Sequence, residues 1–149
     1  DSSEVTVNWD RLKNGEKGKK GRRSIADGIP ASLPALLYAL KLQTRAQRAG
    51  FDWSEPSQVI GKIREETGEL ESAMSSGDLD SAADEIGDLV FSAVNLARKI
   101  GVDPEAAVRR TNRRFVERFA AIEEAARQRG ISPAEMPMEE KERIWQKAK

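Results

Sequence analysis

The feature that most constrains the fold of this chain is a helical repeat of apolar residues across residues 78–100. These residues recur in steps of three and four: Leu79, Ala82, Ile86, Leu89, Ala93, Leu96 and Ile100. That spacing places their side chains on one face of an α-helix. No segment alternates apolar and polar residues as a half-buried strand does, so the sequence predicts an all-α fold.

Start and stop signals divide most of the chain into helices. Ser32 is expected to cap a helix that continues to Gly50, and residues 54–56 open a second helix that stops at residues 76–77. The third helix covers residues 78–100, and the fourth begins at residues 103–104, where an acid precedes a proline. A last short helix opens at residues 132–133 or 137–138. The prediction is an antiparallel bundle of four to five helices.

The charge is unevenly distributed, although 25 basic and 25 acidic residues sum to zero. Residues 11–23 carry seven bases and one acid, with three interspersed glycines. This composition is typical of a mobile basic linker. We therefore predict a flexible N-terminal extension over residues 1–31 and one helical domain over residues 32–149.

The composition excludes several kinds of active site, because the chain has no histidine and no cysteine. Ser-His-Asp and thiol catalysis are ruled out, as is zinc bound by histidine or cysteine. No apolar run is long enough to span a membrane, and residues 1–31 lack the apolar core of a signal peptide. The cytoplasm is the expected compartment, without a membrane partner.

Two carboxylate pairs remain as the strongest chemical signal. Glu66 and Glu69 are three residues apart on the second helix, and Glu85 and Asp88 are three apart on the third. Each pair shares one helix face, and a short connection at residues 76–77 favours antiparallel packing. The four carboxylates are then expected to face each other. Such a cluster suits a hard cation such as Mg²⁺, with Mn²⁺ as an alternative.

Either pair alone is more simply interpreted as part of a solvent-exposed helix surface that binds no metal, because acids three residues apart are common there. Two pairs on adjacent helices, both beside the apolar stripe, favour a metal site instead. A ferritin-like di-iron site would need Glu-x-x-His motifs, which a chain without histidine cannot provide.

Three stretches of the chain, residues 62–70, 84–91 and 94–98, resemble the MazG family. Members of this family are all-α nucleoside triphosphate pyrophosphohydrolases. The family pattern EExxE…ExxD is matched by Glu65, Glu66, Glu69, Glu85 and Asp88. Further similarity lies in residues 33–36, 41–43, 50–53 and 112–119 and in Trp145. The resemblance covers residues 30–149. This part of the chain is similar to the C-terminal MazG domain of two-domain members, so we expect the chain to be part of a longer protein.

The resemblance implies a homodimer that hydrolyses a nucleoside triphosphate to a monophosphate and pyrophosphate. It implies Mg²⁺ ligands at the four paired acids named above. It also implies nucleotide-binding residues on the fourth helix and at the end of the chain: Arg114, Arg118, Trp145 and Lys149. Arg114 replaces the family's lysine, which keeps the charge but changes the geometry.

The residues themselves agree with a phosphate substrate. Arg114 and Arg118 are four apart on one helix face and could clamp phosphate oxygens, although alone they also suit a solvated face. Glu65 or Glu69 is expected to orient or deprotonate the attacking water. The remaining candidates for substrate binding are Lys62, Asn95 and Trp53; for Trp53, a hydrophobic staple at a helix entry is the alternative.

Two other functions stay open at this point. The chain could be a catalytically silent MazG-type module for dimerisation or nucleotide binding. Binding of nucleic acid through residues 11–23 is weakly indicated, because the basic residues have no interleaved aromatic side chains.

Overall fold

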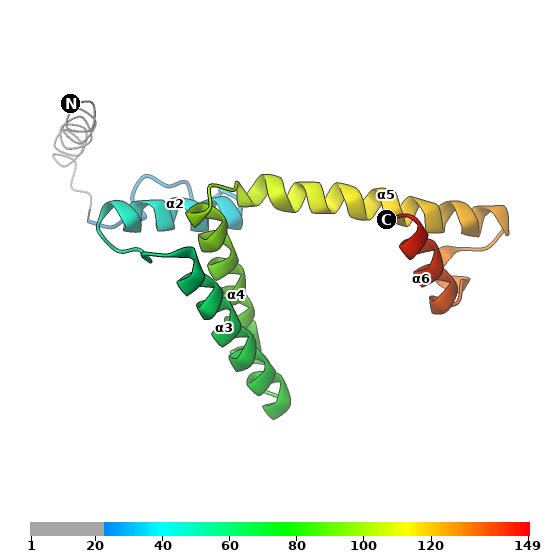
Figure 1. Ribbon diagram of the computed structural model, residues 1–149, viewed down its shortest axis with the longest axis horizontal. Helices are drawn as coiled ribbons and strands as arrows, with labels where there is room; N and C mark the ends of the chain where they lie inside the picture. The colour runs from blue at the N-terminus through cyan, green and yellow to red at the C-terminus, as the bar shows by residue number, and fades with distance from the viewer. Residues whose placement is uncertain (1–22) are drawn as a thin grey trace. The chain divides into compact units, whose positions relative to one another are not determined.

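The computed structural model describes residues 23–149, and within this range the chain is helical without a strand (Figure 1). The elements are α2 (Ala35–Arg48), α3 (Pro56–Ser76), α4 (Leu79–Lys99), α5 (Pro104–Gln128), the 3₁₀ turn η1 (Pro133–Glu135) and α6 (Met138–Lys147). The prediction of an all-α fold is confirmed for these residues. Two compact units divide the chain, a first that ends at Gly101 and a second over Val102–Lys149.

Helices α3 and α4 form a tight antiparallel hairpin, visible as the two green helices in Figure 1. Gly77 ends α3 in the left-handed region, at φ 72°, where a residue with a Cβ is strained. Asp78 then caps α4, since its carboxylate accepts a hydrogen bond from the Ser81 N–H. Turn and cap together leave a connection short enough to hold the two helices side by side.

We expect Gly77→Ala to lower the free energy of unfolding by about 1 kcal/mol, because the alanine must adopt the left-handed conformation. Urea denaturation measures this change. Gly61 is the matched control, since it lies inside α3 with open space around it. Gly61→Ala is expected to stabilise the helix through its higher propensity. An equal response of the two variants would contradict the assigned turn.

The core of the first unit lies between these helices. Val59 of α3 is fully buried, and Ala73, Ala82 and Val94 are buried with it. Helix α2 packs against α4, where the Gln43 amide nitrogen donates to the Phe91 carbonyl oxygen at 2.9 Å. This packing sets the faces of α3 and α4 that carry the candidate site.

The start of α2 differs from the expectation. Ser32 makes no capping hydrogen bond, and the helix begins only after Pro34. The reason is steric, because a residue that precedes proline, here Leu33, is disfavoured in helical conformation. The helix therefore starts after the proline, and Ser32 lies in the preceding turn.

Residues 23–31 belong to the predicted flexible extension but are held against α2 instead. The Arg45 guanidinium donates to the carbonyl oxygens of Ile25, at 2.7 Å, and Asp27. Ile29 is buried. The rest of that extension, including most of the basic segment 11–23, lies outside the described residues.

The second unit packs α5, η1 and α6 around Ile122, Ala126 and Met136. Of the two alternative openings predicted for the last helix, the second is the one found, since α6 starts at Met138 after Pro137. At the first, Ser132 and Glu135 form a capping box that opens the 3₁₀ turn η1 instead. Over the described range, none of the helices combines the length and apolar character that crossing a membrane requires.

Candidate active site

The hairpin of α3 and α4 brings the paired acids together. One group of carboxylates consists of Glu65, Glu66 and Glu69, and another of Glu66, Glu85 and Asp88. Within each group, one oxygen per residue lies within 4.8 Å of the others. Glu66 belongs to both groups and is buried, so it is the centre of the cluster.

Lys62 partly compensates the charge of this centre. Its ammonium nitrogen lies 2.7 Å from Glu66 Oε1 and 3.1 Å from Glu65 Oε1, one turn along α3. The Lys62 ammonium and, to a smaller extent, the neighbouring Glu85 carboxyl group lower the pKa of Glu66. The same contacts with Glu66 and Glu65 raise the pKa of Lys62. Glu66 is therefore ionised, and Lys62 is fixed beside it.

Glu85 behaves in the opposite way. The facing Glu66 carboxylate, burial, and the negative charge of Glu69 raise the pKa of Glu85 to about 7. The cause is like-charge crowding, since two facing carboxylates are best accommodated when one of them holds a proton.

The cluster fits a bound cation by a second criterion. Glu66 Oε2 and Glu85 Oε2 are buried and have no hydrogen-bond donor. Buried carboxylate oxygens without partners are costly unless a cation neutralises them. Oxygen ligands from several carboxylates are the set that Mg²⁺ and Mn²⁺ prefer. The donor set therefore suits a hard divalent ion.

A cavity of about 590 Å³ adjoins this cluster within the first unit. Three predicted substrate-binding residues, Lys62, Trp53 and Asn95, line it together with Gln43, Phe91 and Arg98. Lys62 thus contacts the acid cluster and also lines the cavity. A molecule with a charged end and a largely apolar body matches this combination.

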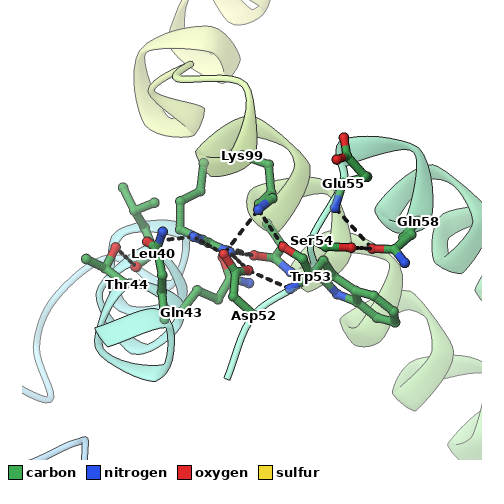
Figure 2. Close-up of polar contacts among 12 residues, drawn as sticks. Leu40, Gln43, Thr44, Asp52, Trp53, Ser54, Glu55, Gln58 and Lys99 are labelled. Atoms are coloured by element: carbon green, nitrogen blue, oxygen red, sulfur yellow. Dashed lines mark hydrogen bonds and ion pairs between the residues drawn. The ribbon is translucent and has the colours of Figure 1, made fainter. Parts of the chain in front are cut away.

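A polar network beside the cavity is absent from the sequence-based candidates. Asp52 pairs with Arg98. It also pairs with Lys99, whose ammonium nitrogen donates to the Trp53 carbonyl oxygen at 2.5 Å (Figure 2). The hydrogen bond from Arg98 is the main cause that lowers the pKa of Asp52. Asp52 and Arg98 are 46 residues apart, so no local spacing indicates their contact.

The other four predicted binding residues belong to the second unit. The Arg118 guanidinium lies over the Trp145 ring, 5.6 Å from its centroid, and Phe115 packs against the same ring at 5.1 Å. Arg114 donates to the Thr111 hydroxyl at 3.2 Å. Lys149 is the last residue of the chain. The structure thus joins Arg118 to Trp145, and the role of all four in nucleotide binding stays a prediction.

Comparisons with known proteins point to one reaction class. Residues 34–115 match the family described as phosphoribosyl-ATP pyrophosphohydrolase. The chain is 43% identical over 141 residues to the nucleoside triphosphate pyrophosphohydrolase/pyrophosphatase MazG of Thermotoga maritima, an alignment of 95% of this chain and 54% of that protein. It is 38% identical over 150 residues to the nucleoside triphosphate pyrophosphohydrolase of Escherichia coli K12, across 99% of this chain and 57% of that protein. The chain spans about half the length of these curated relatives.

Proposed function

This chain belongs to the phosphoribosyl-ATP pyrophosphohydrolase family, and on that premise we propose that it hydrolyses nucleoside triphosphates to a nucleoside monophosphate and pyrophosphate. The resemblance to MazG, first indicated by the acidic motifs, is supported by the relatives that carry this activity in their names. The single observation that carries the proposal is the acid cluster around the buried Glu66, with unpartnered buried oxygens on Glu66 and Glu85, beside a cavity of nucleoside size.

Four acids would hold the divalent ion: Glu66, Glu69, Glu85 and Asp88. Mg²⁺ is the proposed ion, with Mn²⁺ as an alternative of similar ligand preference. When bound, the ion would neutralise charge on the phosphate oxygens and on the departing pyrophosphate. The protein contributes the rigid arrangement of the carboxylates, which the α3–α4 hairpin fixes before substrate arrives.

The reaction needs a water molecule that attacks the α-phosphorus while the bond to the β-phosphate bridging oxygen breaks. Glu65 is one of the exposed members of the cluster, together with Glu69 and Asp88. We propose that Glu65 orients that water or accepts its proton, with Glu69 as the alternative. Lys62 lies beside the cluster and would attract phosphate oxygens. Trp53 and Asn95 would contact the nucleoside in the cavity.

The second unit carries four further candidate residues. We propose, as the resemblance to MazG implies, that Arg114 and Arg118 bind phosphate oxygens and that Trp145 and Lys149 also bind the nucleotide. The stacking of Arg118 on Trp145 supports this in one respect, because it restricts the guanidinium to one orientation.

A panel of substrates tests the proposal. The protein is incubated with Mg²⁺ and each of the common ribo- and deoxyribonucleoside triphosphates, and with phosphoribosyl-ATP because the family description names it. The expected products are one monophosphate and one pyrophosphate per substrate consumed. Release of orthophosphate and a diphosphate, or no turnover with any of these substrates, would overturn the proposal.

A catalytically silent nucleotide-binding module is the alternative. It predicts binding of triphosphates without pyrophosphate release. All five acids of the family pattern are present and grouped, which favours the enzyme.

Three further expectations stay predictions. They are the cytoplasmic location, the position in the C-terminal half of a longer protein, and the lack of a nucleic-acid partner.

We also propose a homodimer and predict a mass of two chains in solution. The described helices α3 and α4 expose large apolar side chains in the single chain, among them Ile86, Val90 and Phe91. Such patches usually mark an interface. Light scattering after size exclusion measures the mass, and a single-chain mass at micromolar protein would contradict the prediction.

Replacing an apolar side chain on this face tests where the interface lies. Val90→Glu is expected to shift the mass toward one chain, because a charge in an apolar interface is costly. Val108→Glu makes the same substitution at an exposed apolar residue of the second unit, and its mass in solution is compared with that of Val90→Glu.

A further inference from the structure

The cavity contains a buried acceptor that the proposed function has not used. The Gln43 amide nitrogen donates to the Phe91 carbonyl oxygen, and a carbonyl can only accept. This contact fixes the orientation of the amide. Gln43 Oε1 is left buried and without a partner, on a residue that is 6% exposed and lines the cavity. An acceptor in this state calls for a ligand that brings an N–H or O–H donor.

Asn95 offers the complementary group on the α4 wall. Its amide oxygen accepts hydrogen bonds from Arg98 Nε at 3.0 Å and Arg98 Nη2 at 2.7 Å. A guanidinium can only donate, so the Asn95 amide nitrogen is turned away from Arg98 and keeps its donors for another partner. The cavity therefore has one oriented acceptor, on Gln43, and one oriented donor group, on Asn95.

Arg98 is itself held in place. It pairs with Asp52 and donates to Gln47 Oε1 at 2.9 Å, and the side chains of Arg98 and Asp52 are only 10% and 15% exposed. Asp52 also ties the segment after α2 to α4 through Lys99. The Asp52–Arg98 pair thereby supports two walls of the cavity at once: the Asn95 amide and the segment that carries Trp53.

We propose that Gln43 and Asn95 recognise the hydrogen-bonding edge of the nucleobase, and that Asp52 and Arg98 are positioning residues for this contact. The ligand class is a planar heteroaromatic base that presents an N–H beside an acceptor atom. Adenine, cytosine, guanine and uracil all have such an edge, so recognition of the base does not require a preference for one of them. This inference rests on the proposed function, because it places the base of that substrate.

Binding of products without a scissile bond tests the inference independently of turnover. Titration calorimetry compares the four common nucleoside 5′-monophosphates with ribose 5-phosphate, which has the same sugar and phosphate but no base. The wild-type chain is expected to bind at least one monophosphate about 10- to 100-fold more tightly than ribose 5-phosphate. Equal affinities would overturn the proposed base contact.

Gln43→Leu removes the acceptor and keeps an apolar side chain of similar size. We expect it to abolish most of the preference for the monophosphate while affinity for ribose 5-phosphate is unchanged. In this variant the Phe91 carbonyl oxygen still accepts its backbone hydrogen bond within α4, so the helix is expected to stay folded. Gln128→Leu is the matched control, because Gln128 is exposed in the second unit. Should Gln43→Leu fail to fold, Asn95→Ala removes the donor from a half-buried position and is expected to reduce the same preference.

Asp52→Asn tests the positioning role. It removes the charge that holds Arg98, so we expect weaker binding of the monophosphate and a higher KM for the triphosphate with little change in kcat. Asp80→Asn, at an exposed position in α4, is the control. A preference for the base that survives both Gln43→Leu and Asp52→Asn would overturn the inference. If the wild-type chain prefers the monophosphate over ribose 5-phosphate but releases no pyrophosphate from any triphosphate, the proposed function is rejected and the base contact stands.

Discussion

Asp88→Asn is expected to lower kcat/KM for pyrophosphate release at least about 100-fold, because it removes one of the proposed charged ligands from the group formed with Glu66 and Glu85. The asparagine keeps the shape of the side chain, so the helices should stay folded. Glu69→Gln is expected to have a comparable effect from the α3 side. Steady-state kinetics with Mg²⁺ and a triphosphate measures both variants.

The stability of the metal-free protein distinguishes a lost ligand from a lost fold. Removing one of several crowded negative charges relieves repulsion, so the free energy of unfolding should not fall in either variant. Asp80→Asn, at the start of α4, controls for loss of an acid at another exposed position of that helix. Wild-type turnover by Asp88→Asn and Glu69→Gln would discard the metal-site assignment.

The sequence predicts those parts of this molecule that depend on short-range rules. Asp103 caps the helix that it precedes, because the capping contact is only two or three residues long. The meeting of Glu66 with Glu85 and Asp88 also follows from short-range rules, since helical spacing and a tight turn at Gly77 determine it. Ser32 fails as a cap because Pro34 excludes the helical conformation just before it.

Contacts across long separations could not be predicted in the same way. The pairing of Asp52 with Arg98 depends on how α2, α4 and the segment between α2 and α3 pack together. The unpaired oxygen of Gln43 likewise depends on the position of Phe91, which is 48 residues away. Charge and polarity indicate that such groups need partners, but only the packing shows which partners they have.

The protonation of Glu85 gives the second large expected effect, a dependence of stability on pH that the proposed metal ion should remove. In the folded protein Glu85 keeps its proton up to a pKa of about 7, against an ordinary value of 4.5. Between these values the unfolded chain loses this proton and the folded protein retains it. The contribution to stability is therefore complete below about pH 4.5 and is lost as the pH rises through 7.

We expect the metal-free protein to unfold at a lower temperature at about pH 8 than at about pH 6, and Mg²⁺ to restore the midpoint mainly at the higher pH. The reason is that a cation bound at Glu66 and Glu85 would neutralise these carboxylates in place of the proton, and competition with that proton would weaken binding at low pH. Thermal unfolding followed by circular dichroism, with and without Mg²⁺, measures both trends.

Glu85→Gln isolates the cause of this effect, because glutamine mimics the protonated carboxyl group at every pH. The metal-free variant is expected to lose the fall in stability between pH 6 and 8, and also most of the stabilisation by Mg²⁺. Glu123→Gln, an exposed acid of the second unit, should leave both trends as in the wild type. If Glu85→Gln retained the wild-type response to Mg²⁺, the ion would be bound elsewhere, and the crowding of Glu66 and Glu85 would have no part in holding it.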